Sequence, residues 1–151
     1  MPVFDYRFTV NASLQQVRDF HADTRALKIL TPPPTFVQLH HVEPLAEGSR
    51  STFTLWVGPL PLQWTAVHHG VSLYGFTDVL ADGPAAKWEH THTFTSINPE
   101  QTQVEEHVEY EHKRGFWGMV TRLLFARPNL FLMFTYRKFA TRRSLRHKSS
   151  E

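Results

Sequence analysis

Apolar and polar residues alternate along most of the chain. The alternation first appears over Val3–Val10 and returns from Thr35 to His112. A period of two places successive side chains on opposite faces, which is typical of a half-buried strand. Turn residues interrupt the second stretch at Glu47-Gly48, Gly58-Pro59, Asp82-Gly83-Pro84 and Asn98-Pro99. The pattern therefore predicts one opening strand and about six further strands joined mostly by short turns, hence antiparallel.

Helical spacing appears in the remaining segments. Ser13 stands three residues before Gln16, a capping-box spacing, and apolar residues follow at helical intervals: Leu14, Val17 and Phe20. A second short helix is predicted over Asp23–Leu30, ended by three consecutive prolines.

A long C-terminal helix is predicted from about Met119 to Leu145, after the glycines at 115 and 118. Pro128 is expected to kink or divide it. One strand, two short helices, a set of antiparallel strands and a long helix describe an α+β domain, and residues 1–151 have the length of one domain. The long helix is expected to lie across one face of a curved sheet.

The two strands that follow Pro84 separate their polar and apolar residues most clearly. Every second residue of the first forms an apolar face that carries two histidines: Trp88, His90, His92 and Phe94. The corresponding face of the next strand carries Val104, Glu106, Val108 and Tyr110. A tight, symmetric turn at Asn98-Pro99 would place His92 opposite Glu106 and His90 opposite Val108, whereas a bulge would shift this register.

Earlier strands add aromatic and ionisable residues to the same side. Burying a polar group without a partner costs roughly 2 to 7 kcal/mol, so a dry core would not carry so many of them. We therefore predict a partly hydrated cavity with apolar walls, the usual character of a small-molecule pocket. The expected ligand-binding residues, including two from the C-terminal helix, are Trp64, His68, Phe76, Asp78, Trp88, His90, His92, Phe94, Glu106, Val108, Tyr110, Phe131 and Phe134.

Several of these residues form motifs that resemble a known family. The motifs are Trp64, Phe76-Thr77-Asp78, Gly83-Pro84, Trp88-x-His90-x-His92-x-Phe94, Glu106-x-Val108-x-Tyr110 and Phe134-x-Tyr136-Arg137. They resemble the polyketide cyclase/dehydrase-like branch of the START and Bet v 1 (SRPBCC) superfamily. The resemblance implies a helix-grip fold, in which a curved antiparallel sheet of about seven strands wraps a long C-terminal helix and leaves a hydrophobic tunnel. This superfamily includes lipid carriers, ubiquinone-binding proteins, plant hormone receptors and aromatase/cyclases, so the fold alone does not select a function.

Three interpretations of the histidine and acid residues remain open. Two histidines and a carboxylate, His90, His92 and Glu106, would provide three ligands to a metal, but a hydrogen-bonded cluster without metal or cofactor is favoured. As an enzyme, the chain would use these three residues for acid–base chemistry of the cyclase or dehydratase type, with Tyr110 or Asp78 as an alternative proton donor. Non-catalytic binding of a hydrophobic small molecule or lipid is the favoured interpretation.

The composition indicates the cellular location of the protein and the classes of partner that it is expected to bind. The chain has no cysteine, and its N-terminus lacks the pattern of a signal peptide, which favours a cytoplasmic protein. The formal net charge is +2, and cations gather near the C-terminus at Arg137, Lys138, Arg142, Arg143, Arg146 and Lys148. These are expected to form a solvated helix face. A nucleic-acid partner is not expected, because an acidic strand carries Glu105, Glu106, Glu109 and Glu111.

Two aromatic residues stand between glycines in Gly115-Phe116-Trp117-Gly118. Three roles are open for this segment: a movable gate, a tip that makes transient contact with an anionic membrane, and a turn whose rings plug the end of the sheet. The sequence does not decide among them, and it leaves the oligomeric state open.

Overall fold

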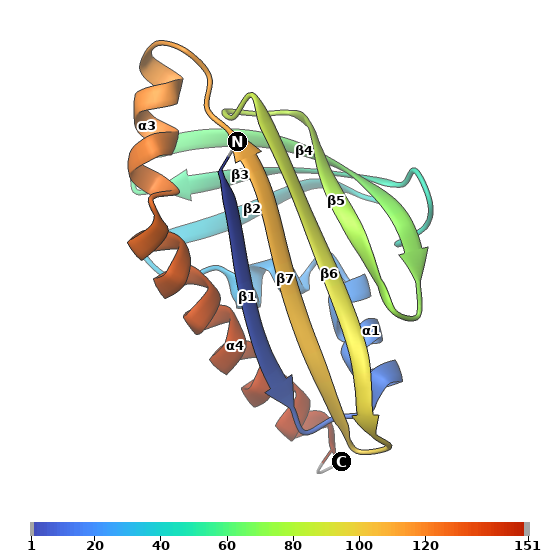
Figure 1. Ribbon diagram of the computed structural model, residues 1–151. Helices are drawn as coiled ribbons and strands as arrows, with labels where there is room; N and C mark the ends of the chain where they lie inside the picture. Colours follow the sequence, from blue (N-terminus) through green and yellow to red (C-terminus); the bar gives the residue numbers. More distant parts are fainter. Residues whose placement is uncertain (1, 150–151) are drawn as a thin grey trace.

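Seven strands form one antiparallel sheet within residues 2–149, which the computed structural model describes. Figure 1 shows the strands at one edge of the sheet crossing those at the other edge steeply, so that the sheet is strongly bent. The order across the sheet is β1-β7-β6-β5-β4-β3-β2. The strands are β1 (Val3–Val10), β2 (Thr35–Val42), β3 (Arg50–Val57), β4 (Leu60–Ser72), β5 (Gly75–Asp82), β6 (Lys87–Asn98) and β7 (Gln101–Glu111). The predicted α+β helix-grip fold is confirmed.

Two short helices follow β1, as predicted. Helix α1 (Leu14–Ala22) begins with the expected capping box: the Gln16 backbone N–H donates to Ser13 Oγ, and the Ser13 N–H donates to Gln16 Oε1. Helix α2 (Ala26–Leu30) occupies the end of its predicted range and stops before the prolines. Helix α1 packs against β6, and α2 packs against the long C-terminal helix.

The C-terminal helical segment is divided into α3 (Phe116–Leu124) and α4 (Arg127–Ser149). Pro128 is the second residue of α4, where its missing N–H removes no helical hydrogen bond. Helix α3 begins three residues before the predicted start at Met119, because Gly118 lies inside α3 instead of in a turn. A Cβ atom at Gly118 would lie 1.7 Å from the Lys113 carbonyl oxygen, so only glycine permits this close approach.

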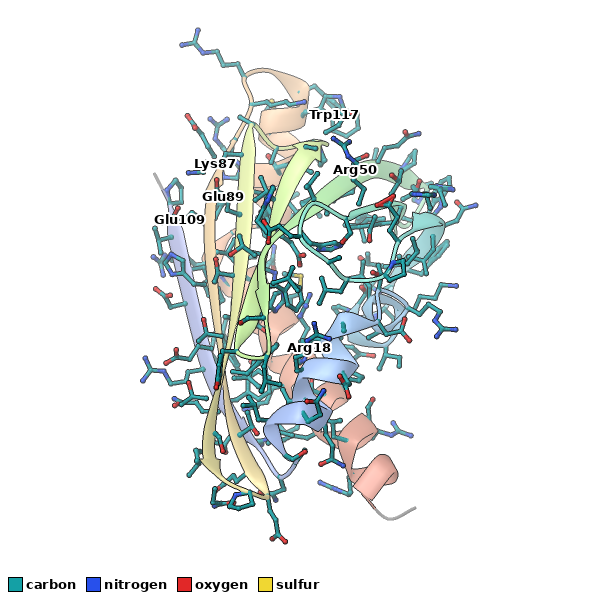
Figure 2. The ribbon with its side chains drawn as sticks, turned by 90° about the vertical axis from the view of Figure 1, so that its right-hand side faces the viewer. Arg18, Arg50, Lys87, Glu89, Glu109 and Trp117 are labelled. Atoms are coloured by element: carbon teal, nitrogen blue, oxygen red, sulfur yellow. The ribbon has the colours of Figure 1, made fainter. Side chains whose placement is uncertain are left out.

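The two faces of the sheet differ as the alternation predicted. On the outer face Lys87 Nζ lies 3.9 Å from a carboxylate oxygen of Glu89 and 3.7 Å from one of Glu109, and Figure 2 shows these side chains on the side away from the helices. On the inner face, Phe94 and Val104 are fully buried. The sheet and α4 therefore enclose the core. No helix among the described residues is long and apolar enough to span a membrane.

Candidate functional site

The two histidines of β6 point into the molecule. His92 pairs with Glu106 and His90 pairs with Val108 across the β6–β7 ladder, which confirms the predicted register. An irregularity at residues 96–98 shifts the register by one position relative to the pair Asn98–Gln101 beside the turn, so the observed pairs result from the turn and this irregularity together. Both imidazoles are buried.

One carboxylate contacts both imidazoles. His90 Nε2 donates a hydrogen bond to Glu106 Oε2 at 2.6 Å. His92 Nδ1 lies 2.8 Å from the same oxygen, an ion-pair contact outside hydrogen-bond alignment. Glu106 is only 2% exposed, so these two rings replace the water that a carboxylate normally binds.

A second carboxylate binds the opposite side of His92. The Nε2 atom of His92 donates to Asp78 Oδ2 at 3.1 Å, and the other oxygen of Asp78 lies 2.5 Å from His68 Nδ1. His68 Nε2 in turn lies 3.2 Å from Ser51 Oγ. The polar cluster, defined as His68, Asp78, His90, His92 and Glu106, therefore forms a continuous chain across β4, β5, β6 and β7.

The polar cluster holds its two neighbouring histidines in opposite protonation states. Burial acts to lower the pKa of His92, but the charge of Glu106 and the bond to Asp78 raise this pKa to about 9. Burial and the charge of His92 lower the pKa of His90 to about 4 in spite of Glu106. At pH 7, His92 is therefore an imidazolium and His90 is a neutral imidazole.

Both carboxylates of the cluster remain ionised. Burial acts to raise the pKa of Glu106, but the charge of His92, followed by contacts with His90, holds this pKa well below its usual range. Burial also acts to raise the pKa of Asp78, but hydrogen bonds from His68 and His92, together with the charge of His92, outweigh burial and lower this pKa. The cluster thus pairs buried charges instead of leaving them isolated, as burial requires.

His21 of α1 joins the cluster without having been predicted. Its Nδ1–H donates to the Val17 carbonyl oxygen at 2.8 Å, and its ring centroid lies 5.7 Å from that of His92. Burial and the charge of His92 lower the pKa of His21 to about 4, so it is neutral at pH 7. Its position one helical turn after the buried residue Val17 is the signal in the sequence that could have predicted its inward orientation.

Arg137 of α4 also faces the site, which corrects a prediction. The sequence placed it in a solvated basic face, but its Nε is buried and makes no hydrogen bond within the described residues. Burial lowers the pKa of Arg137, although arginine keeps its proton in proteins. Its guanidinium carbon lies 5.4 Å from the centroid of the Phe134 ring. Because α4 crosses the sheet, the helix face that bears Arg137 is turned inward.

A cavity of about 500 Å³ lies between the sheet, α2 and α4. This volume falls within the roughly 300–1,000 Å³ of typical ligand pockets. Its wall is mostly apolar and includes Leu27, Leu30, Phe53, Leu55, Leu62, Trp64, Trp88, Phe125, Met133 and Phe134. Its polar lining includes His21, Ser51, His68, Asp78, His90, His92 and Arg137. Other polar residues of the wall are Asp23, Thr24, Thr31, Thr35 and Asn129.

Eight of the thirteen predicted ligand-binding residues line this cavity: Trp64, His68, Phe76, Asp78, Trp88, His90, His92 and Phe134. Four others are buried without lining it: Phe94, Glu106, Val108 and Tyr110. Glu106 contacts the imidazoles of His90 and His92, which line the cavity. The thirteenth, Phe131, was expected to bind the ligand, but it does not line the cavity and is 55% exposed. Its ring packs against that of Tyr6 on β1, with centroids 5.9 Å apart.

The aromatic segment before α4 does not plug the sheet. Phe116 is 65% exposed, and Trp117 lies at the end of the molecule formed by α3 (Figure 2). Phe125 takes the plugging position instead, with its ring centroid 4.7 Å from that of Trp88. In the basic C-terminal segment, Arg143 is exposed as predicted, whereas Arg142 donates to the Thr9 carbonyl oxygen. The Lys148 side chain lies outside the described residues.

Two overlapping groups have the composition of a metal site within the described residues: His21, His92 and Glu106, and Asp78, His90 and His92. In each group, ligand atoms from all three residues lie within 4.8 Å of one another. The hydrogen bonds between the imidazoles and carboxylates already use most of these atoms. A metal would therefore have to displace the proton of His92.

No protein-family model matches the sequence, and no curated protein matches it. Solved structures do match. The Zhui aromatase/cyclase of a Streptomyces species is 13% identical, with a TM-score of 0.77 over 98% of this chain and 95% of its own. A START superfamily protein from Mycobacterium smegmatis is 13% identical, with a TM-score of 0.70 over 96% of this chain and 97% of its own.

Norcoclaurine synthase from Thalictrum flavum, solved with dopamine and hydroxybenzaldehyde, is 15% identical. Its TM-score is 0.68, over 97% of this chain and 87% of its own. Identities this low establish the architecture and leave the activity open. The chain has the START/Bet v 1-like helix-grip fold.

Proposed function

We propose that this protein binds a hydrophobic or aromatic small molecule, or a lipid, in the cavity between the sheet and α4. The observation that supports this most directly is a mostly apolar cavity wall that carries the hydrogen-bonded polar cluster. A mostly apolar cavity with a few convergent polar groups orients a ligand that has one polar end.

The wall would supply most of the affinity. Transfer of apolar surface from water contributes roughly 25 cal/mol per Å². The stacked rings of Phe53 and Trp64, with centroids 6.2 Å apart, provide a broad flat surface for a ring or an acyl chain. At the polar end, Arg137 offers a buried N–H donor that no described residue satisfies. An oxygen atom of the ligand would satisfy it.

The structural neighbours support the same proposal at the level of architecture. The Zhui protein is an aromatase/cyclase, and norcoclaurine synthase was solved with two aromatic compounds. A fold shared with these proteins is compatible with an aromatic ligand in this one.

Native mass spectrometry of the gently purified protein, followed by solvent extraction, tests the proposal. We expect a bound species of small-molecule mass in the wild-type protein. The variant Ala66→Phe places a ring in the cavity, because Ala66 is buried and lines it. We expect this variant to lose the bound species. Ala81→Phe introduces the same ring at an exposed position of β5 and should retain it.

Loss of the species in both variants, or its retention in Ala66→Phe, would contradict the proposal. Thermal unfolding of each variant separates loss of the ligand from loss of the fold. Overpacking a filled core typically costs 1–3 kcal/mol, so a small change for Ala66→Phe would itself show that the space is open.

A second function, acid–base catalysis of the cyclase or dehydratase type, is favoured by one observation. A neutral imidazole and an imidazolium lie side by side, with ring centroids of His90 and His92 4.0 Å apart. The neutral His90 would accept a proton from a carbon next to a carbonyl group. His92 would donate a proton to the oxygen that leaves, so that water is eliminated with the charges balanced.

Hydrogen exchange on a ketone probe tests this second function. A naphthyl methyl ketone deuterated at the methyl group would lose deuterium to water only if a base abstracts it. We expect exchange in the wild-type protein, loss of exchange with retained binding in His90→Asn, and no change in the exposed control His69→Asn. Binding without exchange in the wild-type protein would leave the non-catalytic function alone.

A further inference from the structure

The positive charges of the chain are concentrated in its last third. Ten of the sixteen lysines and arginines lie between residues 113 and 148. No aspartate or glutamate lies between residues 112 and 150. The net charge of +2 is therefore the sum of two opposite parts. The segment that comprises α3 and α4 is strongly basic, and the sheet is acidic. Such asymmetry indicates a partner with negative charge.

Helix α3 presents an apolar face to solvent. The side chains of Phe116, Met119 and Leu123 are 65%, 68% and 71% exposed. Spacings of three and four residues place all three on the same side of the helix. The opposite side, with Gly118 and Thr121, is buried against the rest of the molecule. We call the three exposed residues the α3 face.

Cations flank the α3 face. Arg114 and Arg122 are exposed, one just before the helix and one within it. Lys113 and Arg127 lie at either end of the segment and donate to backbone carbonyl groups of neighbouring segments. Neither α3 nor α4 contains a carboxylate that would neutralise these charges. An exposed apolar face with a basic border is the pattern of helices that lie in the surface of a membrane.

We propose that the α3 face, with Arg114 and Arg122, docks on an anionic lipid bilayer. The apolar side chains would enter the boundary between headgroups and acyl chains, and the arginines would contact anionic headgroups. A second copy of the chain is a poorer occupant, because it would bring two basic segments together. Nucleic acid would pair with the cations but would leave the three apolar side chains without a function.

The position of the cavity would allow a docked molecule to exchange its ligand with the bilayer. Leu132 of α4 lines the cavity and is still 66% exposed, so the cavity reaches the surface there. Leu124, the last residue of α3, lines the cavity too. The cavity therefore extends from this opening to α3, where Leu124 directly follows Leu123 of the α3 face. A docked molecule would hold the opening next to the bilayer, and an apolar ligand would pass between them without crossing water.

Vesicle flotation with the full chain tests the proposal. The vesicles contain phosphatidylcholine alone or phosphatidylcholine with about one third phosphatidylglycerol, which gives the surface negative charge. We expect the protein to float with the anionic vesicles and to remain behind with the neutral ones. Added salt should weaken the binding, because it screens the contacts between arginines and headgroups.

Two pairs of variants assign the binding to the α3 face. Arg114→Gln with Arg122→Gln should weaken binding about thirtyfold, since each cation near an anionic surface contributes roughly a fivefold factor. Met119→Ser with Leu123→Ser should weaken binding at least tenfold. Matched controls are Phe36→Ser, exposed on β2, and Arg7→Gln, exposed on β1; both should float like the wild-type protein. All these positions are exposed, so thermal unfolding should be unchanged.

Equal flotation with neutral and anionic vesicles, or equal flotation of the α3-face variants and the wild-type protein, would overturn the proposal. Sedimentation without vesicles addresses the other occupants. A dimer that Leu123→Ser abolishes would assign the face to a second copy. Duplex DNA that binds as tightly as anionic vesicles, and independently of Leu123, would show a general attraction to polyanions and would also overturn it.

Discussion

The hydrogen bond of Glu106 goes to the diagonal neighbour His90, 2.6 Å away, and not to the residue directly opposite in the ladder. The residue opposite, His92, contacts the same oxygen without hydrogen-bond alignment. Diagonal neighbours on adjacent strands are within reach of long side chains. One buried carboxylate thus fixes two imidazoles at once.

Replacement of Glu106 by glutamine should destabilise the fold and change the pKa values of both histidines. The neutral amide leaves the His92 imidazolium with Asp78 alone, and breaking a buried ion pair costs about 3 kcal/mol or more. The pKa of His92 should fall, because the charge of Glu106 raises it. Urea unfolding measures the stability change, and NMR titration of the imidazole protons measures the pKa.

Glu105→Gln is the matched control on the same strand. Glu105 lies on the outer face, where its side chain is 38% exposed and 3.2 Å from Arg7. Exposed pairs contribute about 0–1 kcal/mol, so this variant should unfold almost as the wild-type protein does. Equal destabilisation by the two variants would show that the position of Glu106 in the cluster is irrelevant.

The free energy of unfolding should reach its maximum near neutral pH and fall on both sides. The pKa of His92 is raised from 6.5 to about 9, so its contribution is complete below pH 6.5 and disappears as the pH rises through 9. The pKa of His90 is lowered from 6.5 to about 4, so its contribution is complete above pH 6.5 and disappears as the pH falls through 4. The loss on the alkaline side amounts to about 3 kcal/mol. The loss on the acid side is larger, because the pKa of His21 is also lowered to about 4.

Urea unfolding between pH 4 and pH 9.5 measures these limbs. The variant His92→Gln should lose the alkaline limb, because no imidazolium remains to be deprotonated. His69→Gln, at an exposed position beside Glu47, should retain it. A stability that stays constant from pH 7 to pH 9 in the wild-type protein would exclude a protonated His92.

The sequence was sufficient to predict the polar cluster, whose five members all lie on strands. It did not indicate Ser51 and Phe53 of β3, which also line the cavity. A period of two leaves only two faces, and the separation of Glu105 from Glu106 along β7 assigned each to its face. The predicted pairs are correct, but the turn alone does not produce them: continued from Asn98–Gln101 without the irregularity at residues 96–98, the ladder would place His92 opposite His107. The sequence does not indicate this irregularity, so the contact between His92 and Glu106 was predicted from an incomplete argument.

The helices were less predictable, because a helix has a continuous range of faces. Phe131 and Phe134 lie close together on the helical surface, and the angle at which α4 crosses the sheet decides which one is buried. Phe134 is fully buried and Phe131 is exposed. The same crossing turns Arg137 inward, against the expectation for a basic tail. No periodicity in the sequence specifies that angle.

Replacement of Arg137 by methionine should raise the pKa values of His21 and His90, since the positive charge of Arg137 lowers both. The effect on stability should be small, because the Arg137 Nε gives up no hydrogen bond. NMR titration measures the two pKa values. Arg143→Met, at an exposed position of the same helix, is the control and should leave both unchanged. Unchanged pKa values of His21 and His90 in Arg137→Met would show that the guanidinium of Arg137 lies away from the cavity.

Phe125 should contribute far more to stability than Phe131, although both belong to the segment that follows α3. The Phe125 ring is 8% exposed and contacts the rings of Trp64 and Trp88, with centroids 6.4 Å and 4.7 Å away. Truncation of a buried phenylalanine to alanine costs about 3–5 kcal/mol, because apolar contacts are lost and a void remains. Phe131→Ala removes a ring that is 55% exposed and should cost less than about 1 kcal/mol. Urea unfolding of the two variants compares them directly. Similar losses would mean that Phe125 does not close this end of the cavity, whereas the expected difference would identify it as the residue that seals the sheet against α3.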